Sequence, residues 1–275
     1  MATTTAETGS GSSNGRPYLF LTLVRHGETV ENKTGILQGQ TDTFLSDKGI
    51  EQAQLAGSKL CDEHFSHVFS SDLKRARKTA EEIVEKSNFS SLIKIVEDSR
   101  LQERCYGVAE GSSLQKFNEM AANNSMKTSA FTPKGGETLA EVKKRATEFL
   151  NSIIHEIGSS HINGSSISPA QNDDNCVSSQ IMNGLESSEH EMHEEQSHLA
   201  NVLIVSHGGV IRQLLYYFVD DLASEFPSGF NRKVRFVSPN TGLSRFKIIM
   251  NEQTKLPEFV KCICLHNTEH LVKAE

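Results

Sequence analysis

Short apolar runs alternate along the chain with longer segments whose apolar positions recur every three or four residues. The short runs predict β-strands, at residues 19–24, 67–72, 93–96, 201–206, 243–249 and 258–265. The helical spacing predicts α-helices, at residues 47–60, 73–84, 139–157 and 208–219. Strands that alternate with helices are typical of an α/β protein. We therefore expect a mostly parallel central sheet with helices on both faces.

Polar residues that commonly cap helices mark the start of three predicted helices. Ser46 precedes the first, and Ser71 or Asp72 precedes the second. Thr138 and Glu141 have the spacing of a capping box before the long third helix.

Two segments lack the strand and helix patterns. Residues 1–17, "MATTTAETGSGSSNGRP", are polar and predict a flexible leader without the basic and apolar regions of a secretory signal. Residues 158–198 are rich in Ser, Asn, Asp, Glu and His, and they predict a mostly disordered insertion. Because strands and helices resume after the insertion, we interpret 18–275 as a single domain that the insertion interrupts.

The composition narrows the class of protein and its partners. Of the 275 residues, 36% are hydrophobic and 23% are charged, which is typical of a soluble globular protein. No apolar run approaches the roughly 18 residues that a membrane-spanning helix needs, so we expect no membrane partner. The net charge of −7 argues against nucleic acid as a partner.

Neither the cysteines nor the clustered histidines indicate a disulfide or a metal site. Five scattered cysteines without a CxxC pair indicate reduced thiols in a cytoplasmic protein. His190, His193 and His198 lie among acidic residues in "EHEMHEEQSH", but they lack the fixed spacing of a metal site. We therefore expect a solvated loop there, and neither a metal nor a cofactor.

Candidate catalytic residues directly follow two of the predicted strands. "LTLVRHGET" places Arg25 and His26 at the end of the first strand, and "VLIVSHGG" places His207 before Gly208 and Gly209. Open α/β proteins bind ligands at the carboxyl ends of their strands, and glycine allows the backbone to approach a ligand closely. One histidine after a strand is more often structural, but two such patterns with an arginine indicate a shared site.

Six motifs in a fixed order resemble the signature of the histidine phosphatase, or phosphoglycerate mutase-like, superfamily. They are "LVRHGET" followed by Asn32, "LSDKGIEQA", "SSDLKRARKTA", "RLQERCYGVAEG", "GGET" and "VSHGGVIR". The resemblance covers about residues 19–157 and 200–265. It implies a phosphoglycerate mutase-like fold and phosphoryl transfer through a phosphohistidine.

The resemblance also implies a role for individual residues. His26 would attack phosphorus, Glu103 would protonate the leaving group, and His207 would donate to the phosphoryl oxygens. Arg25 and Arg75 would neutralise the phosphate, because guanidinium groups match its oxygens and keep their charge. Asn32 would be a further neutral donor to the phosphate, and Arg104, Tyr106 and Lys134 would hold the distal part of the substrate. The residues expected to bind substrate are Asn32, Gln38, Gly39, Arg104, Tyr106, Gly208 and also Lys134.

Further segments resemble a narrower group, the TIGAR-type fructose-2,6-bisphosphatases. The segments include "ILQGQTDTFLS", "FTPKGGETL", "SPNTGLSRF" and "CICLHNTEHL". This resemblance implies a cytoplasmic enzyme of glycolysis regulation. Its substrate would be a small phosphorylated metabolite, namely fructose 2,6-bisphosphate or a related bisphosphoglycerate or sugar phosphate.

Two alternatives remain open from the sequence. A phosphoglycerate mutase would use the same phosphohistidine but return the phosphoryl group to its substrate. A non-catalytic binding module would use residues 158–198 to contact a partner. The complete set of His26, His207, Glu103 and two arginines favours an enzyme. The oligomeric state stays open.

Overall fold

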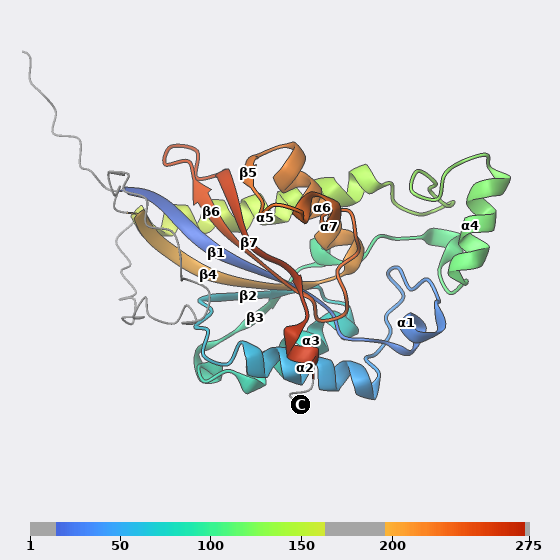
Figure 1. Cartoon of the computed structure of the whole chain (residues 1–275), viewed down its shortest axis with the longest axis horizontal. Helices are drawn as coiled ribbons and strands as arrows, with labels where there is room; N and C mark the ends of the chain where they lie inside the picture. The colour runs from blue at the N-terminus through green and yellow to red at the C-terminus, as the bar shows by residue number, and fades with distance from the viewer. Residues whose placement is uncertain (1–14, 163–195, 273–275) are drawn as a thin grey trace, which may run out of the picture.

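The computed structural model describes residues 15–162 and 196–272, which build one seven-stranded sheet flanked by helices (Figure 1). The strand order is β3-β2-β4-β1-β6-β7-β5. The strands are β1 (Gly15–Arg25), β2 (His67–Ser70), β3 (Ile95–Glu97), β4 (Gln196–Ser206), β5 (Ala223–Glu225), β6 (Leu243–Met250) and β7 (Pro257–Asn267).

Most neighbouring strands of this sheet run parallel. β1 pairs in parallel with β4, β4 with β2, β2 with β3, and β7 with β5. Only the pairs that β6 makes with β1 and β7 are antiparallel among the described strands. The predicted mostly parallel sheet is therefore confirmed.

Helices cover both faces of the sheet, as predicted. In Figure 1, α5 and α6 lie above the sheet, whereas α2 and α3 lie below it. The helices are α1 (Val30–Thr34), α2 (Asp47–Lys59), α3 (Lys74–Lys86), α4 (Leu114–Asn123), α5 (Leu139–Ile162), α6 (Gly208–Asp220) and α7 (Phe230–Lys233).

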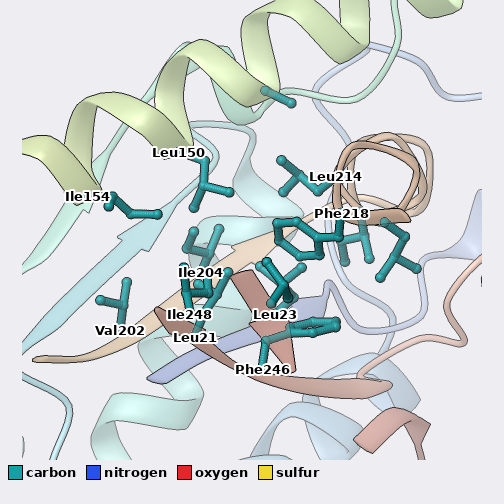
Figure 2. Packing of buried hydrophobic residues seen from close by; sticks show 14 of the residues in the cluster. Leu21, Leu23, Leu150, Ile154, Val202, Ile204, Leu214, Phe218, Phe246 and Ile248 are labelled. Atoms are coloured by element: carbon teal, nitrogen blue, oxygen red, sulfur yellow. The ribbon is translucent and has the colours of Figure 1, made fainter. Parts of the chain in front are cut away.

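The hydrophobic core is divided between these two faces. Figure 2 shows Leu23, Ile204 and Phe246 of three central strands packed with Leu150 of α5 and Phe218 of α6. Val24, the next residue along β1, instead joins the cluster under α2 and α3. Successive strand residues point to opposite faces, and fully burying one such side chain contributes roughly 1.5–3 kcal/mol. The core thus fixes β1 and β4 side by side, with their carboxyl ends together.

Several predicted boundaries are wrong by a few residues. β1 begins at Gly15, inside the predicted leader, because Gly15 pairs with Gln196 of β4. α5 continues to Ile162 and β4 begins at Gln196, so both ends of the predicted insertion belong to regular elements. Residues 1–14 and 163–195, with His190 and His193, lie outside the described residues. The strand predicted at 93–96 is shifted and forms β3.

Two of the three predicted helix caps are confirmed. Ser46 accepts from Gly49 N, and Thr138 and Glu141 form the reciprocal bonds of a capping box. The cap predicted at Ser71 or Asp72 is wrong, because neither side chain accepts an α3 amide. Asp42 Oδ1 accepts from Lys74 N over 2.8 Å instead.

Within residues 15–162 and 196–272, no helix is both long enough and apolar enough to cross a membrane.

Candidate active site

The carboxyl ends of β1 and β4 bring the two predicted histidines together. Arg25 pairs with Ser206 at the last position of the parallel ladder, and His26 N donates to Ser206 O over 2.9 Å. His207 follows Ser206 and caps α6. The ring centroids of His26 and His207 lie 5.1 Å apart. The sequence-based expectation that both strand ends contribute to one site is therefore met in the geometry.

The hydrogen bonds of His26 fix its tautomer. His26 Nδ1 lies 2.7 Å from the carbonyl oxygen of Gly27, which only accepts hydrogen bonds, so Nδ1 carries the proton. The lone pair is then on Nε2. Gly27 N donates to Thr79 Oγ1 over 3.0 Å, which holds this carbonyl in place. The nitrogen of His26 that is available for nucleophilic attack is therefore Nε2.

Burial and charge keep both histidines neutral. His26 is 2% exposed and His207 is 0% exposed. Burial, with help from Arg25 and Arg75, lowers the pKa of His26 well below 6.5. Burial, with help from Arg75, His26 and Arg25, does the same to the pKa of His207. A neutral imidazole has the free lone pair that attack on phosphorus requires.

These shifts predict a dependence of stability on pH. As the pH falls below 6.5, the unfolded chain binds protons on His26 and His207 that the folded chain does not bind. The free energy of unfolding should therefore fall, by up to about 1.4 kcal/mol per pH unit for each histidine. Urea unfolding at several pH values should show a smaller slope in His207→Gln, by about this amount for one histidine. An unchanged slope would contradict the assignment of His207 as neutral.

His207 is oriented by Ser71 and leaves one nitrogen unpaired. Ser71 Oγ accepts from Leu73 N and lies 2.9 Å from His207 Nε2. With the Ser71 hydroxyl donating to Nε2, the proton of the neutral ring is on Nδ1. His207 Nδ1 is buried and has no hydrogen-bond partner. It is therefore a donor that can bind an oxygen of a phosphoryl group.

Arg25 and Arg75 each have one buried nitrogen without a partner. Arg75 Nη2 donates to Gly39 O over 2.7 Å, and its Nη1 donates to Thr41 O over 2.8 Å. Arg25 Nη1 donates to Ser238 O over 2.8 Å. The Nε atoms of both arginines are buried and unpaired. Burial lowers the pKa of Arg75 to about 10, so the guanidinium stays charged at neutral pH.

Glu103 lies close to the same cations and is held by backbone amides. Its Oε1 accepts from Arg104 N over 2.8 Å, and its Oε2 accepts from Gly209 N over 3.0 Å. Its negative charge acts to raise the pKa of Arg25 and of Arg75, partly opposing burial. The general acid candidate is therefore fixed at the amino end of α6, beside the two arginines.

Glycines allow this close approach at two positions. A Cβ atom on Gly209 would lie 2.1 Å from Glu103 Oε1. A Cβ atom on Gly208 would lie 2.4 Å from Val237 Cγ1 and 3.5 Å from Arg25 Nε. Real Cβ atoms do not come as close as 2.1 or 2.4 Å to other atoms, so a side chain at Gly209 would displace the Glu103 carboxyl, and one at Gly208 would displace Val237.

The other residues predicted to bind substrate differ in their hydrogen-bond partners. Asn32 Oδ1 accepts from Thr29 N and from Asn240 Nδ2, which fixes its side-chain amide. Gln38 Oε1 accepts from the hydroxyl of Thr43, and Gly39 presents its carbonyl to Arg75. Gly39 therefore contacts Arg75 directly, whereas Gln38 supports it through Thr43, whose hydroxyl accepts from Arg75 Nη1 over 3.4 Å.

Arg104 and Tyr106 contact each other on the far side of Glu103. Arg104 donates to the carbonyl oxygens of Glu137 and Phe131, so it holds the loop of residues 131–137 in place. Its guanidinium also lies over the ring of Tyr106. Burial and the Glu103 carboxylate raise the pKa of Tyr106 to about 12, so its phenol keeps its proton. Lys134 is exposed, and its carbonyl oxygen accepts from Val108 N.

The structure adds residues that the sequence reasoning missed. Glu110 accepts from Gln40 N and Tyr106 N. It thereby connects the loop whose carbonyl oxygens accept from Arg75 to the loop that contains Glu103. Arg145 Nη2 donates to Glu103 O over 3.0 Å. The motifs "SSDLKRARKTA" and "SPNTGLSRF" contain Ser71 and Asn240. The partners of these two residues, His207 and His26, are distant in sequence.

Arg212 is a further missed residue. Its Nε is buried without a partner, and its charge acts on Tyr106 by lowering the pKa of the phenol. Arg212 follows Gly208 by four residues, so the two share a face of α6. This helical spacing in "SHGGVIR" could have indicated from the sequence that Arg212 lies on the same side of the helix as the site. No group of three acidic, His or Cys side chains within the described ranges has a geometry suited to a metal ion.

Comparisons with known proteins point in the same direction as the geometry. A family model described as the histidine phosphatase superfamily (branch 1) matches residues 21–162. The fructose-2,6-bisphosphatase TIGAR of Mus musculus is 38% identical, over 93% of this chain and 97% of its own length. The fructose-2,6-bisphosphatase TIGAR of Bos taurus is 40% identical, over 91% and 96%.

A solved structure supports the fold. The phosphoglycerate mutase from Bacillus anthracis str. Sterne superposes with a TM-score of 0.66 at 19% identity, covering 94% of this chain and 97% of that one. The predicted phosphoglycerate mutase-like fold is thereby confirmed. With full-length relatives that are enzymes, the alternative of a non-catalytic binding module is set aside. The chain belongs to the histidine phosphatase superfamily and is a phosphatase.

Proposed function

We propose that this phosphatase removes the 2-phosphate of fructose 2,6-bisphosphate through a phosphohistidine at His26. One observation carries the proposal. Three buried N–H donors without partners, Arg25 Nε, Arg75 Nε and His207 Nδ1, belong to residues grouped around the unprotonated Nε2 of His26. Buried donors are rarely left unpaired. A phosphoryl group with three acceptor oxygens would satisfy this arrangement.

The first chemical step forms a bond between His26 Nε2 and phosphorus. The ester P–O bond breaks, and protonated Glu103 gives its proton to the leaving sugar oxygen. The Nδ1–H bond to Gly27 O remains and stabilises the positive charge on the ring. Arg25, Arg75 and His207 donate to the phosphoryl oxygens as the transition state forms.

The second step releases inorganic phosphate. Water attacks phosphorus, the Glu103 carboxylate accepts a proton from that water, and the bond from phosphorus to His26 breaks. His26 returns to the neutral form with its proton on Nδ1. Glu103 is again a carboxylic acid, so no proton or electron remains unaccounted for.

The choice of a bisphosphate rests on the relatives and on a second group of cations. Both relatives described above are named as fructose-2,6-bisphosphatases. Arg212 makes no ion pair with any described residue, although its Nε is buried near Tyr106. A second phosphate would supply the missing negative charge. Arg104, Tyr106 and Lys134 belong to the same proposed substrate-binding group.

A cytoplasmic location and a role in glycolysis regulation are part of the same proposal. The four cysteines within the described residues are free thiols, as expected in a reducing compartment.

A phosphate-release screen tests the substrate assignment. We expect kcat/KM for fructose 2,6-bisphosphate to exceed that for fructose 2-phosphate, which has the same scissile ester and lacks the 6-phosphate, at least about tenfold, because one charged contact to the second phosphate is worth roughly 1.5–3 kcal/mol. Products should be fructose 6-phosphate and phosphate. Arg212→Gln should reduce this preference while leaving turnover of 4-nitrophenyl phosphate nearly unchanged.

The same screen includes 3-phosphoglycerate primed with 2,3-bisphosphoglycerate. Isomer formation faster than phosphate release would favour the mutase alternative over the proposed hydrolysis. Equal kcat/KM for mono- and bisphosphates would contradict the assignment of a second phosphate site.

A further inference from the structure

The loop of residues 238–242, "SPNTG", contacts the nucleophile strand at three points, and we name it the brace loop. Its Ser238 carbonyl accepts from Arg25 Nη1 over 2.8 Å. Asn240 Nδ2 donates to His26 O over 2.9 Å, and Thr241 N donates to Arg25 O over 3.0 Å. The backbone that carries Arg25 and His26 is thus held from the side opposite β4.

Thr241 occupies an unfavourable backbone conformation in the brace loop. Its φ is +53°, a value that β-branched residues rarely adopt, and it is 0% exposed. Such a conformation costs of order 1–3 kcal/mol and persists only where surrounding contacts enforce it. The side-chain contacts of Thr241 therefore indicate what enforces it.

The Thr241 hydroxyl links the brace loop to the turn that follows β7. Thr241 Oγ1 donates to the carbonyl oxygen of Asn240 over 2.8 Å. Its proton is thereby used, so the contact of 3.1 Å with His270 Nε2 is a bond that His270 donates. His270 lies in the short 3-10 helix Glu269–Leu271, which packs on α2.

We propose that His270 is a positioning residue for phosphoryl transfer. Its Nε2–H bond holds Thr241 in the left-handed conformation, and the brace loop in turn holds the backbone of Arg25 and His26. His270 does not touch the reacting atoms, and it acts only through Thr241 and Asn240. The inference rests on the proposed role of His26 as nucleophile.

The alternative is that His270 only packs the 3-10 turn onto α2. The two roles differ in what the ring must supply. Packing needs a flat ring of similar volume, which phenylalanine provides without a donor. Positioning needs an N–H at the place of Nε2, which the amide nitrogen of glutamine provides without a ring. His270→Phe and His270→Gln therefore separate the two roles, and Glu269→Gln on the same exposed turn is the matched control.

The experiment measures kcat and KM with 4-nitrophenyl phosphate, together with rapid-quench formation of phosphoenzyme. We expect His270→Phe to lower kcat and the rate of phosphoenzyme formation about tenfold with KM changed less than about twofold, since a small displacement of a nucleophile reduces rate more than binding. His270→Gln and Glu269→Gln should stay within about twofold of the unmodified enzyme. Thermal unfolding establishes that each variant is folded.

Two outcomes would overturn the inference: a His270→Phe enzyme as fast as the unmodified one, or a His270→Gln enzyme as slow as His270→Phe. The probe is independent of the sugar substrate, so a wrong substrate assignment does not affect the result. If the unmodified enzyme turns over without label on His26, the proposed function fails. The ratio of kcat between the two His270 variants still decides whether the donor matters.

Discussion

Replacing His26 with alanine is expected to lower phosphate release by at least about a thousandfold, because the nucleophile and its covalent intermediate are lost together. The geometry leaves no second candidate among the described residues of the site. His207 Nε2 is bonded to Ser71, and its Nδ1 carries the proton, so neither nitrogen has a free lone pair. Each Glu103 oxygen is held by one backbone amide, and its remaining lone pairs serve proton transfer in the proposed mechanism.

The measurement has a kinetic and a chemical part. Rapid quench in base should trap a label on nitrogen in the unmodified enzyme and no label in His26→Ala. His155→Ala is the matched control, since His155 is exposed on α5, and it should keep full activity. Thermal unfolding should show that His26→Ala is folded. Label on another side chain, or His26→Ala with a tenth of normal activity, would refute the proposed nucleophile.

The central part of the fold was predictable because its periodicities are long and clear. β1, β4 and the helices α5 and α6 have nearly uninterrupted apolar faces, and these faces form the larger core. α4 was not predicted, because its only buried residues are Phe117 and Ala121, and they pack in a small separate cluster. Two buried residues in ten positions do not establish a helical period.

The boundaries of the predicted insertion, residues 158–198, show a second limit of prediction from the sequence. Hydrophobicity alone ended α5 at Ile157, because the polar residues that follow are typical of a loop. The structure continues this helix to Ile162, with Ser160 Oγ bonded to the carbonyl oxygen of Glu156. A helix end that depends on local hydrogen bonds has no signature in the apolar pattern.

The site was predictable where it depends on strand ends. Arg25, His26 and His207 each follow an apolar run, and two neighbouring parallel strands necessarily bring such residues to one edge. Arg75 was predictable only through the resemblance of its motif to the family; the structure then shows that Arg75 is buried, whereas its neighbours Lys74 and Arg77 are exposed.

The supporting contacts were not predictable, because they join loops that are distant in sequence. Ser71 was expected to cap α3, yet its oxygen orients His207, which lies 136 positions away. Asn240 reaches His26 O across 214 positions. No periodicity or spacing encodes such pairs. The residues proposed for direct chemistry could therefore be named from the sequence, whereas the residues that position them required coordinates.

Replacing Glu103 with glutamine is expected to slow turnover of a sugar phosphate about 10²–10⁴-fold, because the side chain can no longer give or accept the proton. Affinity for inorganic phosphate should stay nearly unchanged, since Arg25, Arg75 and His207 make the proposed contacts to it. Glutamine keeps one acceptor oxygen, but its NH₂ group must face either Arg104 N or Gly209 N. Competition by inorganic phosphate therefore checks that the site itself is intact.

The leaving group separates the loss of a proton donor from a displaced loop. 4-Nitrophenolate leaves without protonation, whereas a sugar alkoxide does not, so Glu103→Gln should form phosphoenzyme from 4-nitrophenyl phosphate at close to the normal rate. Its hydrolysis should stay slow, because the same variant lacks the base that activates water. The enzyme should then accumulate as phosphohistidine 26, which a single-turnover experiment detects. Equal loss of the phosphorylation step with both leaving groups would contradict acid catalysis by Glu103, since only a displaced site slows both alike.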